Sequence, residues 1–441
     1  MIGRFGIRFR VGLLVALAVA LLTPAAAVAF DAAHHQVSAL APAGSVAPLP
    51  AAPRAVDHPG RPPALARSAT PQPVAADSDR LPTGIAAAID GQKAALLRGD
   101  LPGFLAPVPP ADTALRAALT RRFNALRAMH VAVWDESVGD LSQNSDGVWS
   151  VPVKVTYCFA VPDCAPLSTS IPTRWTAAAG GARLIAFGTS SADDLGPRPW
   201  EASDLRAAVG TRVIVATTAR YAARLPAMLV AAEKAAAVTE RFARWGNPPG
   251  RYVVYLAGSD EWGKWYGVQQ QPWVAAFAMP LTAVSTEVVL NVNHVDSRDV
   301  TQVLRHEFTH VVTLAGVDRT YDHSWWLVEG IAEYVRVTGA ARPFDGLSDV
   351  RRFVYSGLWS GDVALDSPPQ NATAADVNGR YGVAYLAVKR LADRFGEAKM
   401  LAFFGAVVRD GASLEKASQS VFGAPWAQVS ADCAAAVRMK T

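Results

Sequence analysis

The chain has 441 residues, 51% of them hydrophobic and 18% charged, a composition that excludes a mostly disordered protein, a collagen and a coiled coil. The formal charge is +4, and three of the positive charges, Arg4, Arg8 and Arg10, precede an apolar run at the N-terminus. The remainder carries about +1, so the sequence predicts no nucleic-acid partner, because such a partner needs a clustered basic surface.

Residues 1–29 have the pattern of an export signal. A basic start is followed by an apolar run of about a dozen residues and by a small-x-small site that ends at Ala29. We expect cleavage there and a secreted or cell-envelope protein. The alternative is an uncleaved signal-anchor, because residues 11–30 are almost long enough to span a bilayer. A membrane is therefore an expected partner only if this segment stays attached.

The next two segments predict a linker and a small domain. Residues 30–80 are rich in Ala and Pro and predict a disordered linker. Residues 81–196 predict an α+β accessory domain that packs against the rest of the chain or presents substrate to it. Its helices are expected at 84–100 and 113–129, and its strands at 130–138, 149–159, 168–178 and 181–190. Helices followed by a curved antiparallel sheet resemble the cone-shaped NTF2-like fold, a resemblance that rests on element order.

Two of the three cysteines lie close together in this domain. Cys158 and Cys164 flank a Phe-Ala-Val-Pro-Asp segment, and a hairpin with a Pro-Asp turn would bring their Cα atoms within disulfide range. A disulfide suits an exported protein, whereas a zinc ribbon would need a second cysteine pair. Cys433 is left over and is expected to be a buried thiol in the last helix.

Residues 197–441 predict a second unit of mixed strands and helices. A connector at 197–213 leads into a long helix at 219–245, which can bend at Pro226 because proline removes a helical hydrogen bond. Strands are expected at 211–218, 251–257, 275–281 and 287–293, a Trp-rich loop at 262–273, and amphipathic helices at 385–396, 398–410 and 426–439. A further helix at 297–314 can be capped by Asp296 or Ser297.

That helix carries the sequence HEFTH at residues 306–310. Positions i and i+4 project from the same side of a helix, so His306 and His310 can bind one zinc ion. Glu307 points to an adjacent sector, from which it can reach a zinc-bound water without being a ligand. This arrangement is the HExxH motif of zincins. The alternative is a pair of core histidines, which the next motif makes less plausible.

A second helix is expected around residues 325–334, WWLVEGIAEY. A catalytic zinc needs three protein ligands and one open position, so we assign Glu329 as the third ligand. Glu333 lies one turn further on the same face, where its carboxylate can accept a hydrogen bond from His306 and fix the orientation of that ring. The alternative for Glu333 is a surface carboxylate.

HEFTH, eighteen intervening residues and EGIAEY resemble the gluzincin branch of zinc metallopeptidases, and WLVEGIAEY is similar to exported bacterial hydrolases of the peptidase-MA-like families. The resemblance covers about residues 210–441. It implies a zincin-like domain with a mixed sheet, an active-site helix and a helical C-terminal lobe. It also implies one zinc ion, a peptide or protein substrate, and Glu307 as the general base on a zinc-bound water. A strand within residues 278–293 is expected to form the sheet edge that pairs with substrate.

The family commonly supplies a Tyr or His as hydrogen-bond donor to the oxyanion. The resemblance points to Tyr381, with Tyr385 and His323 as alternatives, and either tyrosine could instead belong to the core. Aminopeptidase relatives carry a Gly-x-Met-Glu-Asn segment whose Glu binds a free amine, but residues 278–281 of this chain are Ala-Met-Pro-Leu. An endopeptidase or a specialised amidase is therefore at least as well supported as an aminopeptidase.

The sequence as a whole predicts an α+β protein with an NTF2-like domain followed by a zincin-like metallopeptidase domain at 197–441. We expect an exported, monomeric zinc metallopeptidase. The competing hypothesis is a binding or cell-envelope assembly module that keeps the zincin fold without turnover. The presence of Glu307 favours the enzyme.

Overall fold

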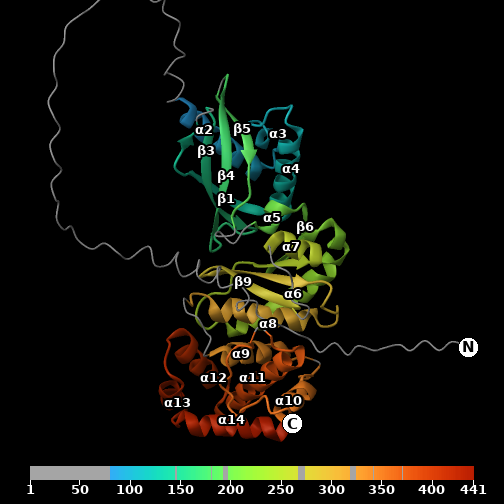
Figure 1. Ribbon diagram of the computed structural model, residues 1–441, viewed down its shortest axis with the longest axis vertical. Helices are drawn as coiled ribbons and strands as arrows, with labels where there is room; N and C mark the ends of the chain where they lie inside the picture. Colours follow the sequence, from blue (N-terminus) through green and yellow to red (C-terminus); the bar gives the residue numbers. More distant parts are fainter. Residues whose placement is uncertain are drawn as a thin grey trace, which may run out of the picture.

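The computed structural model describes residues 80–441, except 145–146, 180, 192–196, 267–273, 318–323, 341 and 370. The expected export signal, nearly all of the expected linker and His323 lie outside the described residues. None of the helices in the described part is both long and apolar enough to cross a membrane. Figure 1 shows three layers stacked along the long axis: an N-terminal unit, a central sheet with its helices, and a C-terminal helical lobe.

The N-terminal unit consists of helices followed by an antiparallel sheet. Its elements are α2 (Arg80–Arg98), α3 (Leu101–Phe104), α4 (Thr113–Ala128), β1 (Val131–Val138), β2 (Ser142–Gln143), β3 (Trp149–Phe159), β4 (Leu167–Ala178) and β5 (Gly181–Phe187). The strand order is β1-β3-β4-β5, and β2 pairs with β3. Along β4, Ile171 and Trp175 are buried and Pro172 and Arg174 are exposed, as the alternating strand geometry requires. The element order is as expected, and the NTF2-like assignment stays a prediction.

The central sheet is mixed. Its strands are β6 (Leu205–Val209), β7 (Val213–Thr218), β8 (Tyr252–Ala257), β9 (Ala276–Thr282) and β10 (Ser285–Asn291), in the order β6-β7-β8-β10-β9. The three inner strands are parallel to one another, whereas β6 and β9 pair antiparallel with their neighbours. The hairpin β9–β10 therefore places β9 at the edge of the sheet.

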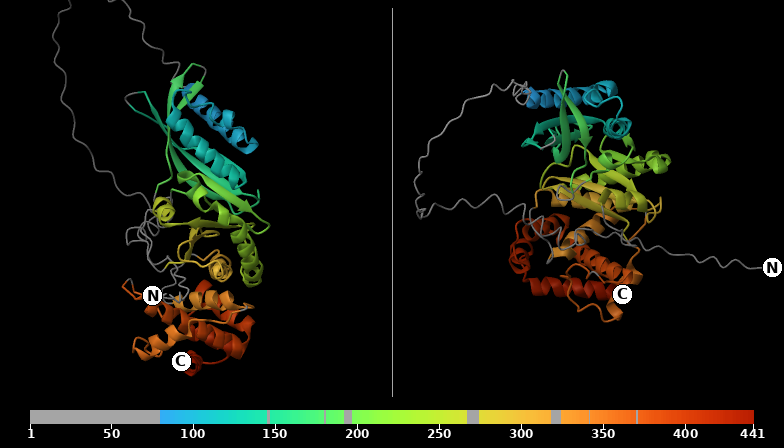
Figure 2. Two further views of the ribbon diagram at one scale, coloured as in Figure 1. Left: turned by 90° about the vertical axis from the view of Figure 1, so that its right-hand side faces the viewer. Right: turned by 45° about the horizontal axis from the view of Figure 1, so that its top comes forward.

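The two faces of this sheet belong to two different hydrophobic cores. Along β8, Val254 and Leu256 pack into the core that contains α6 (Leu225–Thr239) and α8 (Val300–Leu314). Tyr255, between them on β8, packs into the other core, together with Trp134 and Trp175 of the N-terminal unit. Figure 2 shows the N-terminal unit and α8 on opposite sides of the central sheet. One continuous core thus crosses the domain boundary that was expected between residues 196 and 197.

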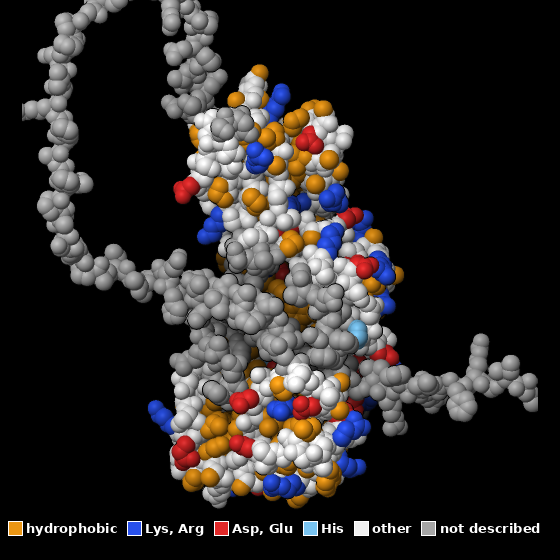
Figure 3. Space-filling view, viewed as in Figure 1, with side chains coloured by type: hydrophobic (Ala, Val, Ile, Leu, Met, Phe, Trp, Pro, Cys, Tyr) orange, Lys and Arg blue, Asp and Glu red, His pale blue; other side chains and the backbone are white. Residues whose placement is uncertain are grey.

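The described residues of the C-terminal lobe contain helices and connecting segments but no strand. It contains α9 (Trp325–Val337), α10 (Leu347–Tyr355), α11 (Ala374–Phe395), α12 (Glu397–Phe404), α13 (Leu414–Phe422) and α14 (Trp426–Lys440), with a π-helical turn, η5 (Gly405–Arg409), after α12. Cys433 is buried on α14, as expected. On the face drawn in Figure 3, basic and acidic side chains are interspersed over all three layers.

Three expectations about the elements ahead of α8 are wrong. The long helix at 219–245 is divided into a 3₁₀ segment, η2 (Ala219–Arg224), then α6, then a short 3₁₀ turn, η3 (Glu240–Phe242), because Pro226 suits the first turn of a new helix. The expected connector contains a short helix, α5 (Pro199–Ala202), and β6. Part of the expected Trp-rich loop is a helix, α7 (Ser259–Tyr266), whose residues Trp262 and Trp265 are buried.

The expected cap of the HEFTH helix is also wrong. α8 begins after Asp299, whose side chain makes no capping hydrogen bond. Asp296 instead accepts hydrogen bonds from the backbone and the guanidinium of Arg298. The helix therefore starts three residues later than the capping signal predicts.

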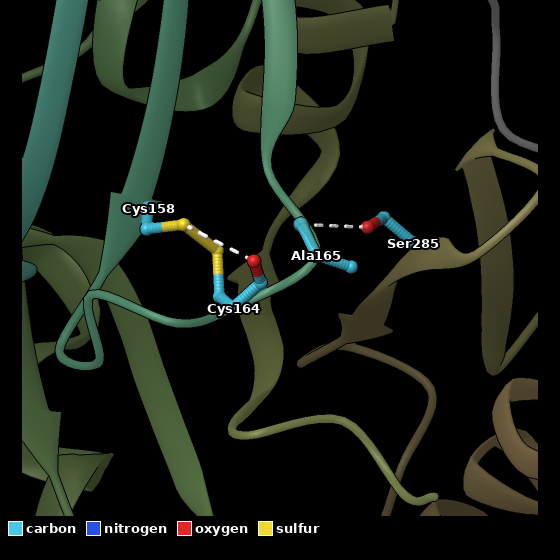
Figure 4. The surroundings of a disulfide bond; sticks show 4 residues. All are labelled: Cys158, Cys164, Ala165 and Ser285. Atoms are coloured by element: carbon cyan, nitrogen blue, oxygen red, sulfur yellow. Dashed lines mark hydrogen bonds between the residues drawn. A yellow bond between two sulfur atoms is a disulfide. The ribbon is translucent and has the colours of Figure 1, made fainter. Parts of the chain in front are cut away.

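The predicted disulfide is confirmed. Cys158 and Cys164 are bonded with their Cα atoms 5.9 Å apart. Ala165, the residue directly after Cys164, lies against the central sheet: the Ser285 hydroxyl at the start of β10 donates to the Ala165 carbonyl at 3.1 Å (Figure 4). The segment that follows the disulfide thus contacts the hairpin that carries the edge strand.

Candidate metal centre

α8 and α9 bring together two histidines and a glutamate. His306 and His310 are one turn apart on α8, with ring centroids 4.8 Å apart. Oε2 of Glu329, on α9, is 3.2 Å from Nε2 of His306 and 3.5 Å from Nε2 of His310. One donor atom from each of the three buried residues lies within 4.8 Å of the other two, so the group can hold a metal ion.

The polar atoms of this group fit a cation. Both ring nitrogens of His310 and Oε1 of Glu329 are buried, and none has a hydrogen-bond partner among the residues that the structure describes. A buried polar atom without a partner costs about 1–3 kcal/mol, so unpartnered acceptors in one group fit the binding of a cation. Two imidazoles and one carboxylate are a donor set that zinc accepts.

The charges of the group depend on one another. Burial disfavours a charged imidazole, but hydrogen bonds to Glu329 and Glu333 outweigh it and raise the pKa of His306 to about 10. Burial lowers the pKa of His310. Burial also disfavours a charged Glu329, but the two histidines outweigh it and lower its pKa to about 2. The carboxylate is therefore held in the ionised form that a metal ligand needs.

Glu333 lies behind His306. Its Oε1 is 2.9 Å from Nδ1 of His306, the ring nitrogen on the far side from Glu329. Glu333 is 4% exposed, so it is not a surface carboxylate. A carboxylate at this position can fix the orientation of the ring.

Glu307 is fully buried on α8 beside the ligand group. Burial raises the pKa of Glu307 to about 8, helped by the charge of Glu329 and opposed by His306 and by the nearby backbone amide of Ala278. Ala278 belongs to the edge strand β9, so the carboxylate lies between the ligand group and the sheet edge. A carboxyl that titrates near neutral pH can both accept and return a proton.

The two tyrosines expected as oxyanion donors lie at different distances from the ligand group. The ring centroid of Tyr381, on α11, is 6.1 Å from that of His306, and Tyr381 packs edge-on against Trp325 at 5.1 Å. Tyr385 stacks on Phe344 at 4.2 Å, in the surroundings of Glu333. Tyr381 is thus next to the ligand group, whereas Tyr385 lies on the side of Glu333.

One buried residue of the centre is missed by reasoning from the sequence. Nε of Arg336 donates to Oε2 of Glu333 at 2.8 Å, and Arg336 is 3% exposed. The spacing of Glu329, Glu333 and Arg336 is i, i+4 and i+7, which places all three on one stripe of α9. This spacing is the signal that could have found Arg336.

Comparisons with known proteins fall on the same segment. Residues 281–346 match the model of a family described as peptidase of plants and bacteria. The match runs from the end of β9 through β10, α8 and α9, so it contains the candidate ligands, Glu307 and Arg336. A comparison of the sequence with curated proteins finds no match.

Solved structures give a similarity over a larger part of the chain. A variant of a two-domain M1 zinc metallopeptidase bound to L-arginine has a TM-score of 0.33 and 12% identity, over 70% of this chain and 60% of that one. An M1 zinc metallopeptidase from Deinococcus radiodurans has a TM-score of 0.31 and 15% identity, over 70% of this chain and 62% of that one. The chain spans about 60% of the length of these structures. It is the family match that relates the segment carrying the candidate metal centre to a peptidase family.

Proposed function

We propose that the protein is an exported zinc metallopeptidase that hydrolyses peptide or protein substrates. The observation that carries the proposal is the convergence of His306, His310 and Glu329 on one point with Glu307 beside them. The peptidase family match over the same segment supports it. Export is inferred from the N-terminal sequence, and the disulfide is compatible with an oxidising compartment.

His306, His310 and Glu329 would hold the zinc ion, which supplies Lewis acidity to the scissile carbonyl and to water. Glu307 then acts as general base: it takes the proton of the attacking water and delivers it to the leaving amine. Neither oxygen of Glu307 has a hydrogen-bond partner of good geometry among the described residues, so both are available for this exchange. Tyr381 is the candidate donor to the oxyanion, because it lies next to His306.

The edge strand offers the backbone groups for an extended substrate. The amide of Asn291 donates to the carbonyl of Ala275 at 2.8 Å, so Ala275 faces β10. Because this direction alternates along an antiparallel strand, Ala276, Ala278 and Pro280 face outward. Pro280 has no amide hydrogen, so the outward amides of β9 are those of Ala276 and Ala278, both of which are buried in the free protein. We infer that a substrate strand pairs there, beside Glu307.

The same strand bears on where the substrate is cut. Residues 278–281 contain no carboxylate that could bind the free amine of a substrate. We therefore infer cleavage within a chain, or a specialised amidase activity, rather than removal of an N-terminal residue.

Metal analysis combined with peptide hydrolysis tests the proposal. The purified protein should contain one zinc ion per chain and should cleave casein or members of a mixed peptide library. Glu307→Gln should retain zinc and lose activity, because it removes the base and leaves the ligands. Zinc without turnover on any peptide would support the binding or assembly module instead. Absence of zinc would refute the assignment of the ligands.

A further inference from the structure

Behind the candidate ligands, α9 carries a buried pair of opposite charge. Arg336 donates to Glu333, and Glu333 contacts His306. Three buried side chains therefore form a hydrogen-bonded series that ends at a candidate ligand. We propose that Arg336 is a positioning residue of the metal centre: it fixes Glu333, which orients His306 for metal binding. The inference rests on the proposed zinc site and concerns a residue that touches neither metal nor substrate.

The argument follows from which atoms can donate. A guanidinium has five N–H donors and no acceptor, so Oε2 of Glu333 must accept from Arg336. Paired with the guanidinium, Glu333 is an ionised carboxylate, which can only accept hydrogen bonds. Nδ1 of His306 must therefore carry the hydrogen that it shares with Oε1. Nε2 of His306, on the side where Glu329 lies, is then the nitrogen left to bind a metal once it releases any proton it carries. Arg336 thus determines which nitrogen of His306 can bind.

Charge balance points to the same role. Glu307, Glu329 and Glu333 are three buried carboxyl groups in one small volume, and Arg336 brings a buried positive charge to them. Buried charges are tolerated when they are paired, and removing one partner leaves the other uncompensated. Without Arg336, Glu333 would lose the partner that holds its Oε2 in place.

The guanidinium of Arg336 also contacts residues nearer the protein surface. Nη2 lies 3.5 Å from Oδ1 of Asp345, whose side chain is 59% exposed, and the guanidinium lies 5.6 Å from the ring centroid of Phe344. The planar guanidinium reaches Glu333 with one nitrogen and Asp345 with another. A lysine has a single nitrogen and cannot hold both carboxylates in the same geometry.

The test is zinc affinity, measured on the full chain by competition with a chromogenic chelator. Arg336→Met should weaken zinc binding about 10- to 100-fold, the usual effect of losing an outer partner of a ligand. Glu333→Gln should have a similar effect, and the double variant should bind no more weakly than Glu333→Gln alone. Arg336→Lys should recover part of the affinity.

A matched control separates positioning from general packing. Arg305, on α8, donates to the Thr338 carbonyl at the end of α9 at 3.0 Å instead of to Glu333. Arg305→Met should leave zinc affinity within about threefold of the original protein. The melting temperatures of the metal-free variants show how much each substitution affects folding alone.

Two results would overturn the proposal: additive effects of Arg336→Met and Glu333→Gln, or unchanged affinity in Arg336→Met. If Arg336→Met does not fold, unchanged affinity in Arg336→Lys would overturn it equally. The readout is independent of hydrolysis. A protein that shows the expected affinities but cleaves no peptide would refute the proposed function and leave the role of Arg336 standing.

Discussion

Gly330 of α9 lies directly against the Ala384 carbonyl of α11: a Cβ at position 330 would be 2.6 Å from that oxygen. The glycine stands next to Glu329, so the close approach of these two helices also sets the position of the candidate third ligand. Real Cβ atoms do not come this close to backbone oxygens, so α9 and α11 would have to move apart to admit a side chain.

Gly330→Ala should therefore lower the free energy of unfolding by about 1–3 kcal/mol through overpacking, and it should also weaken zinc binding. Gly91→Ala is the matched control, because nothing lies within 4 Å of a Cβ there and the site is within α2. That variant should gain about 0.5–1 kcal/mol from helix propensity. Urea unfolding and chelator competition measure both effects. Unchanged stability in Gly330→Ala would contradict the close contact.

Glu287 should make the folded state less stable as pH rises from acidic to neutral. It is fully buried on β10, and burial raises its pKa from 4.5 to about 7, although Arg198 and Tyr255 nearby favour the charged form. Between these values the folded protein keeps a proton that the unfolded chain has lost, so stability falls by roughly 3 kcal/mol as pH rises. Above pH 7 both states are ionised and the loss is complete.

Glu287→Gln removes this titration. The stability of the variant relative to the original protein should therefore increase between pH 4.5 and 7 and stay constant above that range. Urea unfolding at pH 5 and pH 8 measures the difference. Parallel stability profiles for the two proteins would show that Glu287 is not buried as an acid.

Ala276→Pro should weaken substrate binding and leave the metal in place. The amide of Ala276 faces outward from β9, so proline there removes a donor to the substrate strand and no hydrogen bond to β10. We expect a several-fold higher KM with unchanged zinc content. Pro280→Ala is the converse variant, which restores an outward amide and should not raise KM. An unchanged KM in Ala276→Pro would argue against pairing at this edge.

Loss of the disulfide should affect the edge strand as well as stability. The bond between Cys158 and Cys164 closes a short loop, so replacing both with serine should cost about 2–3 kcal/mol. Ala165, the residue after Cys164, contacts the β9–β10 hairpin through Ser285, so KM should also rise. Cys433→Ala is the control, because it keeps the disulfide. Its melting temperature should still fall when a reductant breaks the bond between Cys158 and Cys164. A double serine variant with an unchanged melting temperature would contradict the expected contribution.

The ligand group could be predicted because its geometry is local. His306 and His310 are one helical turn apart, and a single helix period places them on one side whatever the rest of the fold does. Glu329 and Glu333 follow the same rule on α9. What the sequence could not show was how α8 and α9 cross, because that depends on packing around residues such as Gly330.

The missed features depend on contacts between distant segments. Trp262 and Trp265 resemble loop residues in the sequence, yet they lie on α7 and pack into the core of the N-terminal unit. β6 is short, and it is a strand because β7 pairs with it. The spacing of Glu333 and Arg336 on α9 is visible in the sequence, but the contact of Arg336 with Asp345, ahead of α10, depends on the fold.

The core shared by the N-terminal unit and the central sheet has a consequence for how the molecule unfolds. Tyr255, Phe277 and Val289 would face water if the N-terminal unit detached, and an apolar sheet face of this kind attracts other chains. Detachment and loss of the central sheet are therefore coupled. The two units should melt in a single cooperative transition, and a chain that starts at residue 197 should aggregate instead of forming a smaller enzyme.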